Sequence, residues 1–196
     1  MYKYYSSYES EDFLFNHAVK DEAHDYPLHS HDVCELLFLK KGNVSYMVEG
    51  RVYQLAKNCL VISRPSETHS VKFHGPTVYE RYNILFDEKK LASDIYHRPP
   101  SNIDLINFDG NELVCSLFNK ISYYSENFEG DTLKTLLFHL TEEILYNVLL
   151  SSKDFEQSSI CTLNPIINQA LKYINENITN PLSIDAICEE LYITKS

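Results

Sequence analysis

The chain has 196 residues, a length that fits one domain with a small addition. It carries 17 basic and 28 acidic side chains, so its formal net charge is −11 with histidine neutral. Proteins that bind nucleic acid through its phosphates need a basic surface, so this balance speaks against DNA binding by these residues alone. The five glycines form no G-x-G, G-K-[ST] or G-x-S-x-G pattern, which removes sequence support for dinucleotide folds, P-loops and hydrolase elbows.

The five cysteines are dispersed and include no C-x-x-C pair, as expected for free thiols in a reducing compartment. No basic segment followed by an apolar one stands at the N-terminus, so no secretion signal is expected. The apolar runs are far shorter than the roughly 20 residues that a membrane helix needs. We therefore expect a cytoplasmic protein without a membrane partner.

Residues 28–86 consist of short apolar runs separated by turn signals, a pattern typical of antiparallel strands. The runs span 34–39, 44–48, 51–55, 59–62, 69–73 and 78–86. Their regular spacing predicts an antiparallel barrel or sandwich. Alternation along the runs places Tyr46 and Tyr82 on the inward face, and it places Arg81 on the opposite face.

After residue 100 the apolar spacing becomes helical. Asp109 and Glu112 resemble a capping box at the start of one amphipathic helix, and a second helix follows a turn at Gly130. We expect the two helices to pack as an antiparallel hairpin. The apolar stripe of the second helix is wide enough to predict a homodimer interface, with packing on the strands as the alternative role. The residues predicted for this interface are Leu133, Leu137, Leu140 and Ile144.

The last part of the chain shows a polar segment and then further helical spacing. Residues 153–163 are polar and predict a linker. A third helix is expected over 166–178, and a fourth follows Ser183. Ser183 is the expected N-cap of the fourth helix, with Asp185 in its first turn.

The most informative stretch places His29 and His31 two residues apart, with Glu35 four residues further on. On a strand both imidazoles face the same side. Imidazole and carboxylate groups are ligands of transition metals, and His69 is a fourth candidate. Along a straight strand Glu35 would lie ~13 Å from His31, so one shared centre requires a bend near Asp32.

The spacing HxH-x3-E-x6-G, which ends at Gly42, resembles the first cupin motif, and Pro65-x-x-x-His69 resembles the second. Residues 29–86 thus resemble the ligand-sensing cupin domain of AraC/XylS-family transcriptional regulators. The tail from Leu171 to Ser196 is similar to the opening of that family's helix-turn-helix DNA-binding domain. This resemblance implies an α+β fold: an antiparallel cupin-type β-barrel (jelly roll), then a helical hairpin and a truncated helix-turn-helix segment.

The resemblance also divides the chain into parts. It implies a cupin-type effector-binding domain at 1–100, a dimerisation hairpin at 101–152, a linker at 153–163 and the incomplete start of a helix-turn-helix domain at 164–196. Because the sequence ends before the groove-reading helix, DNA binding is expected of the full-length protein and not of these residues alone. Two residues depart from the metal-binding cupin motifs: Ala23 stands where a glycine is usual, and Glu67 replaces a small residue.

The implied function is an effector-sensing and dimerising part of a transcriptional regulator, without enzymatic activity. The effector is expected to be a small metabolite, for example a sugar. The residues expected to bind it are His29, His31, Glu35, Tyr46, His69 and Tyr82. In this family the histidine and glutamate positions usually line or support an organic ligand pocket, so no cofactor is expected. Framework hydrogen bonding and metal binding remain open as other roles for the histidines.

The alternative function is a metal-dependent cupin enzyme, a dioxygenase or isomerase, that would use His29, His31, Glu35 and His69. The segment that resembles a DNA-binding domain counts against an enzyme. A third interpretation is a stand-alone inhibitor that dimerises with full-length partners.

Overall fold

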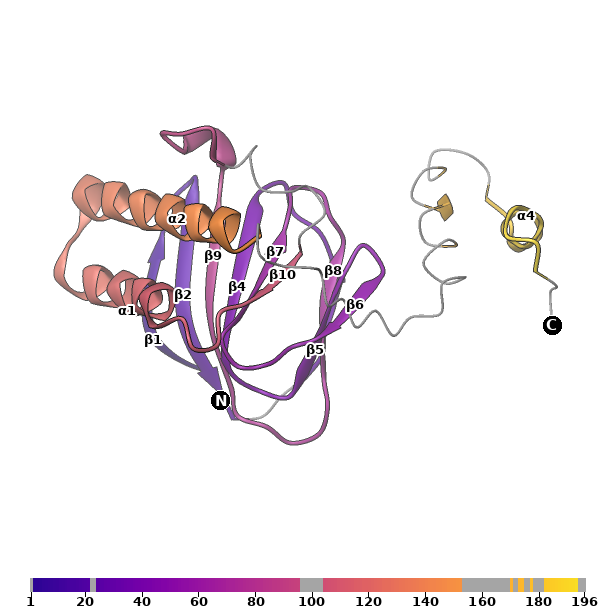
Figure 1. The fold of residues 1–196 in the computed structure, drawn as a ribbon, viewed down its shortest axis with the longest axis horizontal. Coiled ribbons are helices and arrows are strands. Elements are labelled where there is room, and N and C mark those ends of the chain that lie inside the picture. The colour runs from indigo at the N-terminus through magenta and orange to yellow at the C-terminus, as the bar shows by residue number, and fades with distance from the viewer. Residues whose placement is uncertain are drawn as a thin grey trace.

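The computed structural model describes residues 2–21, 24–95, 104–152, 170, 173–174, 177 and 182–193. In this part of the chain ten strands form two antiparallel sheets, and two long helices cover one of them (Figure 1). The six-stranded sheet has the order β1-β2-β9-β4-β7-β10. Its strands are β1 (Tyr2–Glu9), β2 (Phe13–Lys20), β9 (Tyr79–Phe86), β4 (Cys34–Lys41), β7 (Cys59–Ser63) and β10 (Leu105–Asn107).

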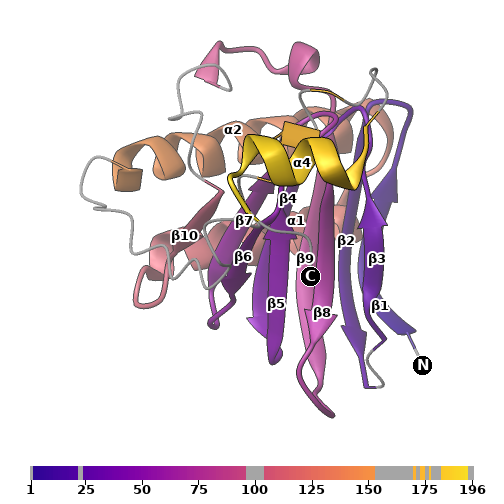
Figure 2. The ribbon, with the colours of Figure 1, turned by 90° about the vertical axis from the view of Figure 1, so that its right-hand side faces the viewer.

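The four-stranded sheet has the order β3-β8-β5-β6 and faces the viewer in Figure 2. Its strands are β3 (Tyr26–His29), β8 (His69–Phe73), β5 (Val44–Val48) and β6 (Arg51–Gln54). The six runs predicted between residues 34 and 86 correspond to β4 through β9. Strands β1, β2, β3 and β10 were not predicted. Strand β10 lies within the range 101–152 expected for the helical hairpin, and it pairs with β7.

Two apolar layers explain the burial pattern of the six-stranded sheet. One layer lies between the sheets and includes Leu37, Leu39 and Tyr46. The other lies between the six-stranded sheet and the helices and includes Leu36 and Phe38. Residues 34–39 are therefore all buried, because successive side chains of β4 enter opposite layers. Both faces of this sheet are covered.

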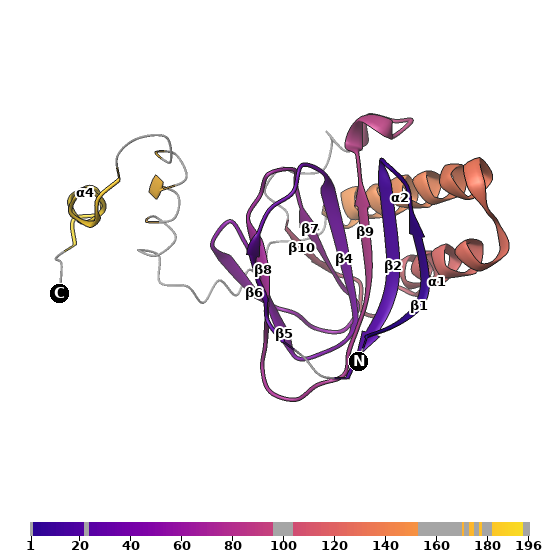
Figure 3. The ribbon, with the colours of Figure 1, turned by 180° about the vertical axis from the view of Figure 1, so that it is seen from behind.

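Helices α1 (Glu112–Asn127) and α2 (Gly130–Ser152) form the predicted hairpin and lie against the six-stranded sheet (Figure 3). The four residues predicted for a dimer interface are buried within the chain itself, at 0–5 % exposure. They are Leu133, Leu137, Leu140 and Ile144, and they pack in the apolar layer under the helices. The assignment of these residues to a dimer interface is therefore wrong. The sheet and α1 cover the broad stripe of α2 without a second subunit.

The N-terminus of α1 differs from the predicted capping box. Asn111 is the N-cap, and its side-chain oxygen accepts a hydrogen bond from the backbone N–H of Val114. Asp109 stands two residues before this N-cap, and its carboxylate accepts a hydrogen bond from the Asn58 amide instead. Gly110, at a φ of +80°, turns the chain between the two residues.

Helix α4 (Ile184–Glu190) is the fourth predicted helix. Ser183 is its N-cap and accepts a hydrogen bond from the backbone N–H of Ala186, as predicted, and Asp185 lies in the first turn. The predicted linker at 153–163 and most of the predicted helix at 166–178 lie outside the described residues. None of the described helices combines the length and the apolar character needed to cross a membrane. None of the four described cysteines forms a disulfide.

Candidate functional site

A cavity of about 190 Å³ lies between the two sheets and collects most of the predicted site residues. Five of the six predicted ligand-binding residues line it, and they come from β3, β4, β5, β8 and the segment between β3 and β4. They are His29, His31, Glu35, Tyr46 and His69. A larger hollow of about 440 Å³ between α2 and Lys90 is an open surface groove with side chains of both charges.

The predicted bend brings the two halves of the first motif together. Strand β3 ends at His29 and β4 begins at Cys34, so the chain turns between them. As a result, Nε2 of His31 lies 2.9 Å from Oε2 of Glu35. His69 enters from β8 as the register partner of His29, and its Nε2 lies 3.0 Å from the same Glu35 oxygen.

Glu35 is the buried charge at the centre of this cluster, with a side chain that is 8 % exposed. Burial alone would raise its pKa, but hydrogen bonds and positive charge from His31 and His69 lower the pKa of Glu35 to about 2. The hydrogen bond to Glu35 in turn raises the pKa of His31. The carboxylate is therefore ionised at neutral pH, and it favours the protonated form of His31.

Each of the three histidines is held by a backbone carbonyl. Nδ1 of His29 lies 2.8 Å from the Pro27 oxygen, and Nδ1 of His31 lies 2.9 Å from the Val33 oxygen. Nδ1 of His69 lies 3.0 Å from the Glu67 oxygen. A carbonyl oxygen can only accept, so each Nδ1 carries a proton and each Nε2 is directed toward the cluster.

This donor set fits a divalent transition metal. Ligand atoms of His29, Glu35 and His69 all lie within 4.8 Å of one another. Histidine ligands in metal sites commonly donate their second ring N–H to a carbonyl, which is the arrangement observed here. Imidazole and carboxylate ligands suit zinc, iron and related ions. The contact between His31 and Glu35 also fits an ion pair that needs no metal.

Tyr46 and Tyr82 occupy different places. Tyr46 lies parallel to His69 with ring centroids 5.9 Å apart, and its hydroxyl forms a hydrogen bond with Ser63. Tyr82 lies on the other face of the sheet, where its ring stacks on His17 and its hydroxyl donates to Asn119 of α1. The inward orientation predicted for Tyr82 is therefore wrong. Alternation identified two faces of β9, but both are buried, so it could not identify the face toward the cavity.

The outward orientation predicted for Arg81 is also wrong. It lines the cavity together with Tyr26, Tyr79 and Asn83, and it is 9 % exposed. Arg81 and Asn83 alternate with apolar residues along β9, so a polar parity was present in the sequence. Alternation alone does not tell which face of β9 the helices cover, so it does not place this polar parity in the cavity.

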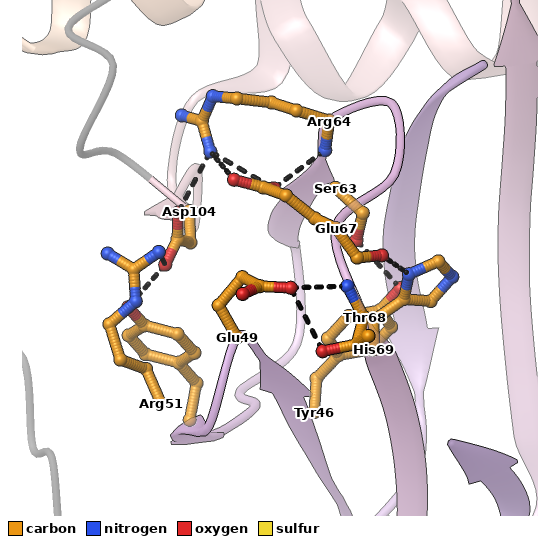
Figure 4. A network of polar contacts seen from close by, with 10 residues as sticks. Tyr46, Glu49, Arg51, Ser63, Arg64, Glu67, Thr68, His69 and Asp104 are labelled. Carbon is orange, nitrogen blue, oxygen red and sulfur yellow. Dashed lines mark hydrogen bonds and ion pairs between the residues drawn. The ribbon is translucent and has the colours of Figure 1, made fainter. Parts of the chain in front are cut away.

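Polar contacts on the turn between β7 and β8 hold the His69 side of the cavity (Figure 4). The Glu67 carboxylate accepts hydrogen bonds from the backbone N–H and the guanidinium of Arg64. Arg64 also pairs with Asp104, which is buried and pairs with Arg51 as well. Because the carbonyl of Glu67 accepts from His69, this network orients a cavity residue. It explains the departure from a small residue at position 67.

Residues 15–101 match the family described as the AraC-like ligand binding domain. Among solved structures, the AraC-like transcriptional activator CuxR aligns with 96 % of this chain and 69 % of its own, at 16 % identity and a TM-score of 0.54. The fold is a cupin fold. It belongs to the α+β class, with antiparallel sheets followed by helices.

Two further solved structures are similar over less than half of this chain. The cupin domain of Cnp3 from Schizosaccharomyces pombe aligns with 45 % of this chain and 67 % of its own, at 16 % identity and a TM-score of 0.39. The DMSP lyase DddQ from Ruegeria pomeroyi aligns with 42 % of each chain, at 17 % identity and a TM-score of 0.36. The comparison with curated proteins gives no match.

Proposed function

We propose that this chain is the effector-sensing part of an AraC-type transcriptional regulator, and that a small metabolite binds in the barrel cavity. The observation that carries the proposal is a cavity between the two sheets, within the residues that match the AraC-like ligand binding domain. Ligand sites are concave and combine apolar walls with a few converging polar groups, and this cavity has both. His29, His31, Glu35, Tyr46 and His69 are the proposed ligand contacts.

The signal is proposed to pass from the barrel to DNA through a helix-turn-helix domain. Residues 164–196 resemble the beginning of such a domain. A ligand can change DNA binding only if it binds more tightly to one arrangement of the regulator than to the other. The hairpin is proposed to join two copies of the chain, through the residues of α1 and α2 that remain exposed.

Thermal unfolding with a library of small polar metabolites tests ligand binding in the cavity. A compound present at 100 times its Kd stabilises the folded protein by roughly 2.7 kcal/mol, which raises Tm by several degrees. Val71→Phe fills the cavity, whereas Val52→Phe on β6 adds the same ring outside it. We expect a compound that raises Tm of the wild type and of Val52→Phe but not of Val71→Phe. A library without such a compound would contradict the proposal.

A metal-dependent cupin enzyme is the second candidate, favoured by the three Nδ1–carbonyl hydrogen bonds. Elemental analysis of untagged protein, purified without chelators, tests it. An enzyme of this kind should contain about one metal ion per chain, lost in His29→Ala and kept in His139→Ala, which changes an exposed histidine of α2. Substoichiometric metal that His29→Ala does not change would remove this candidate.

A further inference from the structure

The wall of the cavity formed by β9 carries a positive charge, that of Arg81. Arg81 is 9 % exposed, and its guanidinium donates a hydrogen bond to the Asn16 amide oxygen. Among the described residues no carboxylate forms an ion pair with it. Glu35, the acidic residue of the cavity, is engaged by His31 and His69 instead. A buried guanidinium without a counter-charge is costly, so an anion is the ligand that this wall would stabilise most.

Polar atoms without partners gather in the same cavity. Among the described residues, three buried side-chain oxygens of cavity residues have no hydrogen-bond partner: Tyr26 Oη, Tyr79 Oη and Asn83 Oδ1. Buried polar atoms are nearly always paired in folded proteins. Their concentration in one place indicates that a ligand supplies the missing partners.

The chemistry of these atoms defines what the ligand must offer. The Tyr26 and Tyr79 hydroxyls lie near the Arg81 charge, and burial raises the pKa of both phenols, so both are protonated donors at neutral pH. Two donors beside a guanidinium suit the oxygens of an anion. The unpaired oxygen of Asn83 requires the opposite, a donor on the ligand. One small molecule that carries both an anionic group and a donor such as a hydroxyl group would supply all of these partners.

We propose that the cavity binds a small hydroxycarboxylate, whose carboxylate pairs with Arg81 and accepts from Tyr26 and Tyr79 while its hydroxyl donates to Asn83. This inference rests on the proposed function, because it names the ligand class of the same site. The volume of about 190 Å³ is smaller than the roughly 300–1,000 Å³ of pockets for drug-sized ligands, which fits a molecule of a few carbons. A neutral sugar supplies hydroxyl groups but leaves Arg81 without a counter-charge.

Matched probes test the proposal by thermal shift and titration calorimetry on the chain. The probes are hydroxycarboxylates of three to six carbons, including lactate and malate, with lactamide, malamide, xylose and inorganic phosphate as comparisons. We expect at least one hydroxycarboxylate to raise Tm and its uncharged amide to have little effect. Arg81→Gln should weaken that binding about 10- to 100-fold, the loss of one charge-assisted contact. Lys72→Gln removes an exposed cation from β8 and should leave binding unchanged.

Tyr26→Phe and Tyr79→Phe provide a second test if Arg81→Gln unfolds, since each removes one hydroxyl donor and keeps the ring. Each should weaken hydroxycarboxylate binding and leave circular dichroism spectra unchanged. The proposal is overturned if no hydroxycarboxylate binds, if the amides bind equally well, or if phosphate binds more tightly. It is also overturned, with the proposed function intact, if xylose or another neutral metabolite binds and Val71→Phe abolishes that binding.

Discussion

At the scale of single residues, Gly42 shows why the first motif ends with glycine. Its φ is +154°, a backbone conformation that residues with a side chain rarely adopt. A Cβ atom there would lie 3.0 Å from the ring of Tyr79 and 3.3 Å from the Leu39 side chain. Because Tyr79 lines the cavity, Gly42 leaves room for a side chain of the candidate site.

Gly42→Ala should therefore destabilise the protein through both backbone strain and overpacking. Gly75→Ala is the matched control, because Gly75 also has a positive φ but has no atom within 4 Å of an added Cβ. We expect Gly42→Ala to lower the free energy of unfolding by roughly 1–3 kcal/mol more than Gly75→Ala, the usual cost of overpacking a core. Chemical denaturation of both variants measures the difference. Equal losses would show that Tyr79 moves aside without cost.

At the scale of secondary-structure elements, the sequence predicted those whose signal is local. The alternation and turns of β4 through β9, the apolar stripes of α1 and α2 and the Ser183 cap all depend on neighbours within a few residues. Strand β10, with three residues, is too short to show a period. Strand β1 has a Tyr- and Ser-rich sequence without a clear apolar face.

Properties that depend on distant packing could not be predicted in the same way. The predicted orientations of Tyr82 and Arg81 on β9 are the reverse of those observed. Alternation along the strand does not tell which of its two faces the helices cover. Similarly, the width of the α2 stripe did not reveal that the chain itself covers Leu137 and Ile144. The histidine–glutamate cluster was predictable because its motif and the required bend were both encoded in a short stretch.

An ion pair at the edge of the barrel ties α2 to the start of β2, and its pH dependence can be predicted. Nζ of Lys134 lies 2.7 Å from Oδ1 of Asp12. The hydrogen bond from Lys134 lowers the pKa of Asp12 below 3.8, and the hydrogen bond to Asp12 raises the pKa of Lys134 above 10.5. The pair therefore stabilises the folded state above the unfolded Asp pKa, and this contribution is lost as the pH falls through the lower folded value. At the alkaline end the contribution is fully present below the ordinary lysine pKa and is lost as the pH rises through the raised folded pKa of Lys134.

Lys134→Gln should accordingly lower Tm by a small and constant amount between about pH 5 and pH 9, and by less at pH 3. The decrease should also shrink in high salt, since the pair is partly exposed. Lys120→Gln removes an exposed lysine from α1 and should change Tm little at any of these values. Differential scanning calorimetry across the pH range measures these shifts. A deficit that is as large at pH 3 as at pH 7 would mean that packing of the lysine stem, and not its charge, is responsible.

At the scale of the whole molecule, β9 connects the cavity to the helical hairpin. Arg81 and Asn83 face the cavity, while Tyr82 between them lies under α1 and donates to Asn119. Phe118 of the same helix stacks on Phe38 of β4, whose neighbour Leu37 lines the cavity. A ligand that shifts either strand must therefore also shift side chains that support α1. In a sensor, this is a direct physical route from the cavity to an interface formed by the hairpin.

The hairpin keeps three large apolar side chains exposed at one end, and these predict how two copies would meet. Leu113 at the start of α1 is 80 % exposed, while Tyr146 and Leu150 near the end of α2 are 42 % and 61 % exposed. Because the helices are antiparallel, the start of α1 and the end of α2 lie at the same end of the hairpin.

We expect the purified chain to be a dimer at high micromolar concentration by light scattering. Leu113→Glu combined with Leu150→Glu should make it monomeric, because charges in an apolar interface are not compensated. Leu28→Glu, on exposed β3, should remain dimeric, and a wild-type chain that is strictly monomeric would contradict the prediction.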